Sequence, residues 1–321
     1  MEIKENELIK RLKKFGRSSP EVLRGIGDDG AVAEFEKGSY VFVQDGFTEH
    51  IHFDFALTDI YYVGKKAIYA NVSDILSMGA EPMYFMVTIG IPARIKSKEV
   101  AKLYRGMNNA AGEFSIILLG GDTVETRNDF FIDVSMVGKL VTGRYLGREN
   151  AKEGDLIGVT GLLGESAYGL NLLQKGQKAK SSNRFMNRYM SPKPQYGLWK
   201  ELIKSDITNA MMDISDGLII DLERMMLESK KSAKIHFESI PMPDILKREG
   251  LEEFALGGGE DYQFLFTFPS RKIPIVAGLA NKGFSITIIG EIMKGKGVQI
   301  FRNGKKIKTD FKGYEHFGAD L

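Results

Sequence analysis

Acidic residues beside glycines recur along this sequence, and carboxylates in such loops are good ligands for a hard cation. Five motifs carry them: Gly25-Ile26-Gly27-Asp28-Asp29-Gly30, Asp45-Gly46, Gly120-Gly121-Asp122-Thr123, Asp213-Ile214-Ser215-Asp216-Gly217 and Gly257-Gly258-Gly259-Glu260-Asp261-Tyr262. Each one alone is more often a solvated turn. Most of them, however, stand at the ends of expected strands or helices, and this repetition indicates a common site.

Converging carboxylates need a cation. Two of them 4 Å apart repel by about 4 kcal/mol at an effective dielectric constant of 20. Several such pairs would cancel much of a folding stability of ~5–15 kcal/mol unless cations neutralised them. Mg²⁺ suits an all-oxygen ligand set and commonly bridges carboxylates to phosphates. The sequence therefore predicts phosphoryl transfer from ATP, assisted by several Mg²⁺ ions.

The known phosphate-binding motifs do not explain this pattern. Gly25 to Gly30 matches the dinucleotide motif G-x-G-x-x-G, but a loop precedes it and strand-like residues follow, the reverse of the required context. The sequence has neither a G-x-x-x-x-G-K-[ST] motif nor the H-R-D and D-F-G motifs of protein kinases. Ser215 or Asp216 is expected to cap a helix whose N–H groups then face an anion.

Two further polar sets have both structural and functional interpretations. His50, His52 and Asp54 alternate on an expected strand at 50–55, which suits packing, a transition-metal site or a hydrogen bond to a substrate. Asn71 and Asp74 lie three residues apart on an expected helix, so their side chains point the same way. For this pair, structural hydrogen bonding and contact with a metal or ligand both stay open.

The elements that must position these residues follow from the hydrophobic pattern. Strands are expected at 31–35, 40–45, 50–55, 84–91, 116–119 and 130–141, and helices at 59–78 and 97–114. Asp45 and Asp122 would then stand at strand ends. After a polar, glycine-bearing stretch, strands are expected at 155–160, 234–237, 263–268 and 285–289, helices at 198–204 and 217–227, and a terminal hairpin at Asn303-Gly304.

Length and composition limit the class of protein. The 321 residues favour two domains, which we place at 1–147 and 148–321. The fold class is α/β (α+β). With 44 Lys+Arg against 42 Asp+Glu, the charge favours neither nucleic acid nor membrane as a partner. Zero cysteines exclude disulfides and thiolate chemistry. Met1–Lys14 lacks the apolar core of a signal peptide, so a cytoplasmic location is expected.

Taken together, the motifs resemble the thiamine-monophosphate kinase family, in the superfamily of aminoimidazole ribonucleotide synthetase and selenophosphate synthetase. The resemblance spans nearly the whole chain. Its carriers are Gly25-Ile26-Gly27-Asp28-Asp29, Glu49 with His52-Phe53, Lys66-Ala67, Asn71-Val72-Ser73-Asp74, Met78-Gly79-Ala80, Gly120-Gly121-Asp122-Thr123, Thr160-Gly161 with Gly164, Asp213-Ile214-Ser215-Asp216-Gly217-Leu218, Gly258-Gly259-Glu260-Asp261-Tyr262, and Gly313-Tyr314 with His316-Phe317. Their shared order and spacing make the resemblance specific.

The resemblance implies direct in-line phosphoryl transfer from ATP to thiamine monophosphate, without a phosphoenzyme or a catalytic side chain. It implies Mg²⁺ ligation by Asp29, Asp45, Asp74, Asp122, Asp213 and Asp216. It implies nucleotide contacts from Tyr104, Gly121, Asp122, Arg148 and Ser215, and thiamine contacts from His52, Glu260 and Tyr314. It further implies a homodimer, in which the N-terminal domains pair their mixed sheets and bind the nucleotide near that interface, and a C-terminal α/β domain like that of aminoimidazole ribonucleotide synthetase.

The chain departs from the family pattern at several positions. Val43-Gln44-Asp45-Gly46 replaces the usual Thr-Thr-Asp-Thr, His50 replaces a glycine, and Gln195 replaces an arginine. Two alternatives therefore remain: a superfamily enzyme with another acceptor, such as a purine-pathway synthetase, and a non-catalytic nucleotide-binding scaffold.

Overall fold

The computed structural model describes residues 13–15, 20, 22–24, 32–33 and 35–307. The chain divides into two compact units. The first comprises residues 1–76 and 80–143, and the second comprises residues 77–79 and 144–321. Each unit is built around its own sheet.

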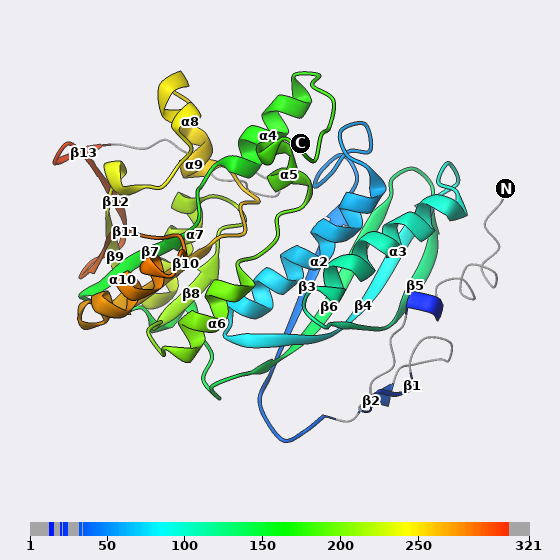
Figure 1. Cartoon of the computed structure of the whole chain (residues 1–321), viewed down its shortest axis with the longest axis horizontal. Helices are drawn as coiled ribbons and strands as arrows, with labels where there is room; N and C mark the ends of the chain where they lie inside the picture. Colours follow the sequence, from blue (N-terminus) through cyan, green and yellow to red (C-terminus); the bar gives the residue numbers. More distant parts are fainter. Residues whose placement is uncertain (1–12, 16–19, 21, 25–31, 34, 308–321) are drawn as a thin grey trace. The chain divides into compact units, whose positions relative to one another are not determined.

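A four-stranded sheet forms the first unit (Figure 1). Its strands are β3 (Tyr40–Thr48), β4 (Ala80–Pro92), β5 (Ile117–Thr126) and β6 (Phe131–Leu140), in the order β3-β6-β4-β5. Only the β4–β5 pair is parallel within this sheet. The helices are α2 (Ile60–Ser77) and α3 (Ser97–Gly112), and short elements η1 (Lys13–Phe15), β1 (Val22–Arg24) and β2 (Val32–Ala33) precede the sheet.

One face of this sheet is covered by α2 and α3 (Figure 1). In β6 every second residue from Ile132 to Gly138 is buried, as expected for a strand with one covered face. A Cβ atom on Gly138 would lie 2.5 Å from Cγ2 of Ile75 on α2, so these alternate residues face α2. Asp59 starts α2, since its Oδ1 accepts a hydrogen bond from the backbone N of Tyr61 at 2.9 Å.

A seven-stranded sheet forms the second unit, in the order β13-β12-β9-β11-β7-β10-β8. The strands are β7 (Asp155–Thr160), β8 (Ala210–Asp213), β9 (Ser232–His236), β10 (Phe264–Pro269), β11 (Ile286–Met293), β12 (Gly297–Arg302) and β13 (Lys305–Ile307). The helices are α4 (Glu165–Gln174), α5 (Arg184–Met190), α6 (Tyr196–Lys204), α7 (Leu218–Ser229), α8 (Asp244–Glu249), α9 (Glu253–Gly257) and α10 (Ile273–Asn281), with 3₁₀ turns η2 (Arg148–Asn150), η3 (Phe237–Ser239) and η4 (Ser270–Lys272). The β9–β12 pair is parallel and the other pairs are antiparallel.

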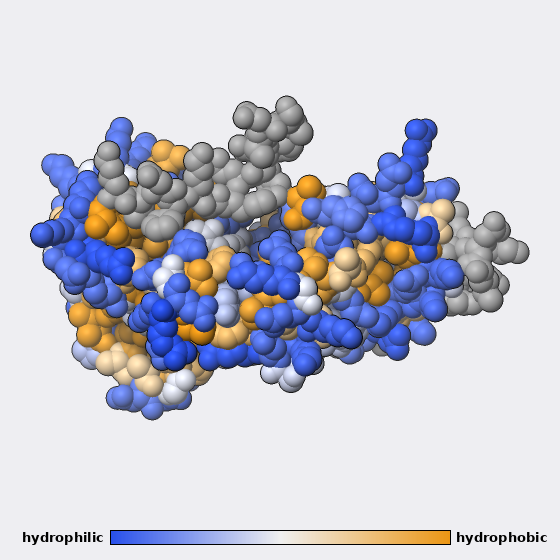
Figure 2. Space-filling view, turned by 90° about the horizontal axis from the view of Figure 1, so that it is seen from above, coloured by the Kyte–Doolittle hydropathy of each residue, from blue (hydrophilic) through white to orange (hydrophobic). Residues whose placement is uncertain are grey.

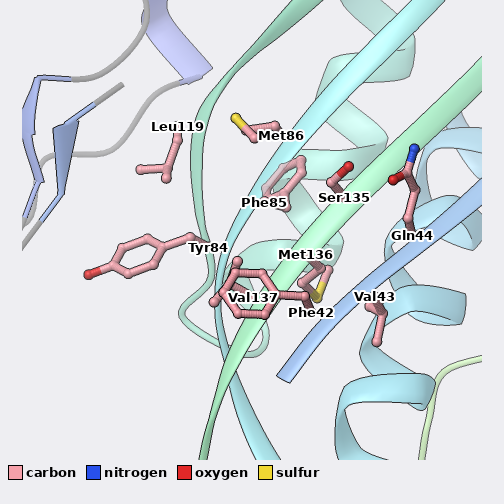
Figure 3. A pocket seen from close by; sticks show the side chains of 10 residues that line it. All are labelled: Phe42, Val43, Gln44, Tyr84, Phe85, Met86, Leu119, Ser135, Met136 and Val137. Atoms are coloured by element: carbon pink, nitrogen blue, oxygen red, sulfur yellow. The ribbon is translucent and has the colours of Figure 1, made fainter. Parts of the chain in front are cut away.

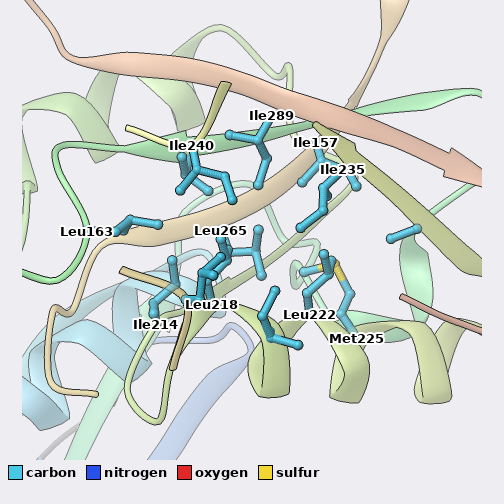
Figure 4. Packing of buried hydrophobic residues seen from close by; sticks show 14 of the residues in the cluster. Ile157, Leu163, Ile214, Leu218, Leu222, Met225, Ile235, Ile240, Leu265 and Ile289 are labelled. Atoms are coloured by element: carbon cyan, nitrogen blue, oxygen red, sulfur yellow. The ribbon is translucent and has the colours of Figure 1, made fainter. Parts of the chain in front are cut away.

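The core of the second unit lies between α7 and its sheet (Figure 4). Leu218, Leu222 and Met225 recur at helical spacing on α7 and are fully buried. They belong to one cluster with Ile157 of β7 and Leu265 of β10. This packing fixes the start of α7, where two of the acidic motifs meet.

Most elements expected from the sequence are present, including the hairpin at Asn303-Gly304, where both residues have positive φ. Three expectations were wrong. Residues 50–55 form turns instead of a strand. Asp45 does not end β3, which continues to Thr48 through nine paired residues. Nor does the strand before Asp122 stop at Leu119, because β5 runs to Thr126 beside β4. Unbroken pairing with a neighbouring strand outweighs the low strand propensity of glycine and aspartate.

Within the described residues, no helix is both long and apolar enough to cross a membrane. Figure 2 shows hydrophilic residues interspersed with hydrophobic ones over the face in view.

Candidate functional site

Two predicted metal ligands of the first unit belong to the same layer. Asp45 lies opposite Val134 in the β3–β6 register, and Val134 shares its face of β6 with Gly138, the residue against α2. Asp45 therefore projects from the face of the sheet that α2 covers. Asp74 lies on α2 itself, next to Ile75. Both carboxylates are half-buried, which strengthens their interaction with a cation relative to bulk water.

Asn71 lies one turn before Asp74 and is fully buried. Its Nδ2 donates to the carbonyl of Ala67 at 3.0 Å, whereas its Oδ1 has no hydrogen-bond partner among the described residues. A buried acceptor without a donor costs about 1–3 kcal/mol. Structural hydrogen bonding, one of the two roles that the sequence left open for Asn71, therefore explains the Nδ2 group but not Oδ1.

Asp122 lies on the opposite edge of the same sheet. It is exposed on β5, and its Oδ1 accepts a hydrogen bond from the N of Thr123 at 2.7 Å. Three strand spacings of ~4.8 Å separate the edge strands β3 and β5, or about 14 Å. One chain therefore does not bring Asp45 and Asp122 to a single ion. Beside Asp122, a Cβ atom on Gly121 would lie 1.9 Å from the carbonyl O of Val87, so this position excludes any side chain.

His52 is held in the turn that follows β3. The backbone N of Thr48 donates to its Nδ1 at 3.0 Å, and its ring packs edge-on against Phe47 with centroids 5.7 Å apart. Because Nδ1 accepts this bond, the neutral ring carries its proton on Nε2. His52 is therefore set to donate a hydrogen bond from Nε2.

Tyr104 is buried on α3, and its ring lies 5.7 Å from that of Phe15. Burial raises the pKa of its phenol above the ordinary value, so the side chain is a neutral hydroxyl at physiological pH.

Three predicted site residues of the second unit are brought together by two neighbouring loops. Asp213 ends β8 and is buried, opposite Phe264 of β10. Past that pair, the N of Glu260 donates to the carbonyl of Ser215 at 2.7 Å. The N of Tyr262 donates to the carbonyl of Ile214 at 2.8 Å. The motifs 213–217 and 257–262 thus form one structure, as their shared composition suggested.

The glycines of these loops allow a close backbone approach. A Cβ atom on Gly259 would lie 2.6 Å from the carbonyl O of Ser215, and one on Gly217 would lie 2.8 Å from the backbone of Gly257. Glu260 itself has a φ of +65°, a conformation that costs a non-glycine residue of order 1 kcal/mol or more. A strained acidic residue held by close-packed glycines is typical of a functional loop.

The helix start after Asp213 differs from the prediction. Gly217 is the N-cap of α7 and makes no side-chain cap. The N–H groups of Ser215, Asp216 and Gly217 donate to Oδ2 of Asp221, at 3.0–3.2 Å. The carboxylate of Asp221, a residue of α7 itself, therefore takes the place of an anion at the start of this helix. Oδ2 of Asp216 accepts from Nη1 of Arg224 at 2.5 Å. Burial raises the pKa of Asp221 to about 6, against the effect of its N–H donors.

Arg148 is exposed on η2, and η2 packs against β8 and α7, the elements that flank Asp213 to Gly217. The second unit thus gathers Arg148, Asp213, Ser215, Asp216 and Glu260 in one region. Asp29 and Tyr314, with the rest of their motifs, lie outside the described residues.

Three residues that hold this region together were not predicted to do so. Asp221 and Arg188 belonged to no predicted motif, and Asp261 was predicted only as one acid of the motif at 257–262. Asp261 accepts from the N–H groups of Gly164 and Ser166 at the start of α4, while Arg188 donates to the carbonyl of Asp261. A second acid directly after Glu260 was the available signal for Asp261; Arg188 is not marked by any local pattern.

The donor chemistry fits Mg²⁺. The predicted ligands within the described residues are all aspartates, whose hard oxygen atoms Mg²⁺ prefers. Asn71 adds a buried oxygen acceptor on the helix that bears Asp74. These residues would hold the ions; bound Mg²⁺ supplies charge neutralisation for transferring phosphate.

A separate hollow of about 370 Å³ lies on the first unit's sheet (Figure 3). Its lining includes Phe42, Gln44, Tyr84, Met86 and Val137. Phe42 is 73% exposed and Met86 48% exposed, so large apolar side chains face outward here.

Comparison with known proteins gives two domain matches. Residues 27–140 match the AIR synthase related protein, N-terminal domain, and residues 152–303 match the AIR synthase related protein, C-terminal domain. The expected two-domain α/β fold is confirmed by these matches and by the solved structures below.

Similar proteins extend over nearly the full length. The thiamine-monophosphate kinase of Buchnera aphidicola subsp. Schizaphis graminum is 33% identical, over 99% of this chain and 100% of its own. The crystal structure of thiamine-monophosphate kinase from Stenotrophomonas maltophilia K279a covers 96% of this chain and 99% of its own, with a TM-score of 0.83 and 28% identity. A structure of AaThiL complexed with AMPPCP and TMP covers 97% and 96%, with a TM-score of 0.77 and 31% identity. The chain therefore belongs to the thiamine-monophosphate kinase family.

Proposed function

We propose that this chain transfers the γ-phosphoryl group of ATP to thiamine monophosphate, giving thiamine diphosphate and ADP by direct in-line displacement. The observation that carries the proposal is full-length similarity to AaThiL, whose structure holds AMPPCP and TMP together. Phosphoryl transfer needs positioning and charge stabilisation more than a reactive side chain. A chain rich in grouped aspartates suits that chemistry.

For the metal ions, we propose ligation by Asp29, Asp45, Asp74, Asp122, Asp213 and Asp216. For the nucleotide, we propose contacts from Tyr104, Gly121, Asp122, Arg148 and Ser215. The cationic, exposed Arg148 supports the nucleotide assignment. The neutral hydroxyl of Tyr104 suits a hydrogen bond and not an ionic contact.

For the acceptor, we propose contacts from His52, Glu260 and Tyr314. Nε2 of His52 is set to donate a hydrogen bond, and the Glu260 carboxylate attracts the positive thiazolium ring of thiamine. In this assignment these residues hold the thiamine part of the acceptor, and no side chain becomes phosphorylated.

The test is a product assay with the purified full chain, ATP, Mg²⁺ and thiamine monophosphate. Formation of thiamine diphosphate is expected. Turnover of ATP with only another acceptor would identify a related superfamily enzyme, while binding of ATP without turnover would identify a scaffold.

Asp74→Asn provides the internal check on the metal assignment. We expect loss of at least 10²-fold in kcat with an unchanged fold, because the amide keeps the shape but removes the charge that holds Mg²⁺. Asp206→Asn is the matched control, since Asp206 is 70% exposed and Asn tolerates its positive φ. Near-normal turnover in Asp74→Asn would refute the metal assignment.

We further infer a homodimer formed through the first unit. The exposed apolar side chains of Phe42 and Met86 around the hollow in Figure 3 support a self-complementary sheet contact. A homodimer also offers a route by which Asp45 of one protomer meets the edge strand that carries Asp122 in its partner. Sedimentation of the full chain should give a dimer, and Phe42→Glu should shift it toward monomer.

We place the protein in the cytoplasm, in keeping with the absence of cysteine from the sequence. We also propose that the two functional domains meet near residue 147. The structural boundary lies three to four residues earlier, between Gly143 and Arg144.

A further inference from the structure

A mixed nitrogen and oxygen ligand set lies beyond the end of β3, apart from the acidic residues assigned to Mg²⁺. Glu49, His50 and Asp129 each offer one ligand atom, and these atoms lie within 4.8 Å of one another. We propose that these three residues bind one borderline transition-metal ion, of which Zn²⁺ is the type.

The spacing is close to that of a tetrahedral centre. Zn–N and Zn–O bonds of ~2.0–2.2 Å place neighbouring ligand atoms about 3.4 Å apart. Nε2 of His50 and Oε1 of Glu49 are 3.8 Å apart, beyond hydrogen-bond reach but near the separation that a shared ion imposes. His50 and Asp129 are exposed, so their side chains have solvent on one side into which they can rotate when they close on a shared ion.

Glu49 is the fixed member of the set. It is 4% exposed, and its Oε2 accepts from the N of Phe130 at 2.9 Å and from Arg94. Its Oε1 accepts no hydrogen bond among the described residues and is directed at His50. A carboxylate oxygen without a protein donor is open to a cation, so an ion at this point would give it a partner.

The imidazole is already oriented for metal binding. Nδ1 of His50 lies 3.3 Å from Oδ2 of Asp54, while Oδ1 of Asp54 accepts from the N of Ala56 at 2.7 Å. With the proton held on Nδ1 by this carboxylate, Nε2 presents its lone pair toward Glu49. Carboxylate–histidine–metal arrangements of this kind fix the tautomer and raise ligand basicity.

Charge and backbone geometry agree with this interpretation. Three carboxylates, from Glu49, Asp54 and Asp129, face one guanidinium, from Arg94, which leaves a local charge of −2 when His50 is neutral. One divalent ion brings this to zero. His50 also has a φ of +66°, where glycine would be less strained, so the imidazole is held here at a conformational cost.

The ion would clamp two segments together. Glu49 and His50 follow β3, while Asp129 lies in the β5–β6 connection, where its carbonyl accepts from Oγ1 of Thr126 at 2.7 Å. Arg94 already bridges Glu49 and the carbonyl of Asn128. The clamp would thus stiffen the turn that carries His52. Nitrogen ligation favours Zn²⁺, Co²⁺ or Ni²⁺ over Mg²⁺.

The test is Zn²⁺ binding by the full chain, measured by equilibrium dialysis in excess Mg²⁺ to occupy the all-oxygen sites. We expect His50→Gly and Asp129→Asn each to bind one Zn²⁺ fewer per chain than the wild type. Asp54→Asn, which keeps the Ala56 contact, should weaken the same binding about 10- to 100-fold. Co²⁺ should give a visible d–d spectrum in the wild type that is lost in His50→Gly.

His236→Asn is the matched control, since His236 is exposed on β9 in the other unit. It should leave both the Zn²⁺ count and the Co²⁺ spectrum unchanged. His50→Gly should fold normally, because glycine suits the positive φ at this position. Its melting temperature without Zn²⁺ should therefore not fall below that of the wild type. Unchanged Zn²⁺ stoichiometry in both His50→Gly and Asp129→Asn would overturn the proposal, as would equal loss in His236→Asn.

Discussion

Asp261 shows how a single buried carboxyl group affects this fold. It is 1% exposed and receives two backbone N–H bonds, yet burial raises its pKa to about 7. Desolvation of the charged form therefore outweighs the N–H donors and the nearby Arg188. At neutral pH, this side chain is close to its point of ionisation.

The pKa shift predicts a pH dependence of stability. The folded pKa lies above the ordinary value of 3.8, so the folded state holds the proton more tightly than the unfolded chain. This contribution is full below about pH 4 and is lost as the pH rises through 7. Relative to Asp261→Asn, the wild type should lose on the order of 2–4 kcal/mol in unfolding free energy between pH 4 and 7.5.

Urea denaturation of both proteins across that range measures this difference. Asp206→Asn should run nearly parallel to the wild type, because Asp206 is 70% exposed and solvent screens its ion pair with Arg144. A difference between wild type and Asp261→Asn that stays constant with pH would contradict the assignment.

The sequence identified candidate functional residues at the positions where acidic residues lie beside glycines. The loops that carry Ser215 and Glu260 are joined by backbone hydrogen bonds, next to the paired residues Asp213 and Phe264. Arg188 and Asp221 were not recognised, because their roles depend on partners 73 and 4 to 6 residues away, reached only after folding. His50, read as part of a strand, lies in a turn because Glu49 pairs with Phe53 across it.

At the scale of elements, the crossing of α2 and α3 depends on two glycines. A Cβ atom on Gly64 would lie 2.3 Å from the carbonyl O of Leu103, and one on Gly106 would lie 1.9 Å from that of Tyr61. The helices touch backbone to backbone here. This contact sets the position of α2, and hence of Asp74, over the sheet.

Gly106→Ala should therefore destabilise the protein, although alanine is the better helix former. Overpacking of a tight contact typically costs about 1–3 kcal/mol. Gly278 is the matched control, a helical glycine of α10 whose added Cβ would meet nothing within 4 Å. Gly278→Ala should raise stability by about 0.5–1 kcal/mol. Chemical denaturation compares the two variants, and stabilisation by both would disprove the close crossing.

Element types followed from hydrophobic periodicity, whereas element ends did not. The expected helix at 59–78 corresponds to α2, since Asp59 caps it and apolar residues recur along it. β3 and β5 extended beyond their predicted ends because each continues to pair with a long neighbour. Backbone pairing across a sheet depends on residues distant in the sequence, so local propensity does not reveal it.

At the scale of the whole molecule, the positions of β3 and β5 at opposite edges of one sheet limit how a shared metal site can form. Asp45 and Asp122 are about 14 Å apart across one sheet, yet the proposed function assigns both to the metal site. In a two-fold dimer, an edge strand of one protomer can lie beside the opposite edge strand of its partner. A site completed in this way would need one carboxylate from each chain.

Mixing inactive variants tests this arrangement. Asp45→Asn and Asp122→Asn should each be inactive alone. Co-expressed, they form about half heterodimers, in which one of two sites receives both intact aspartates, so about a quarter of wild-type activity should return. Asp45→Asn mixed with Asp74→Asn should stay inactive, because both carboxylates come from the same protomer and every site loses one. If neither mixture recovers activity, Asp122 either belongs to a site made within one chain or does not belong to the metal site.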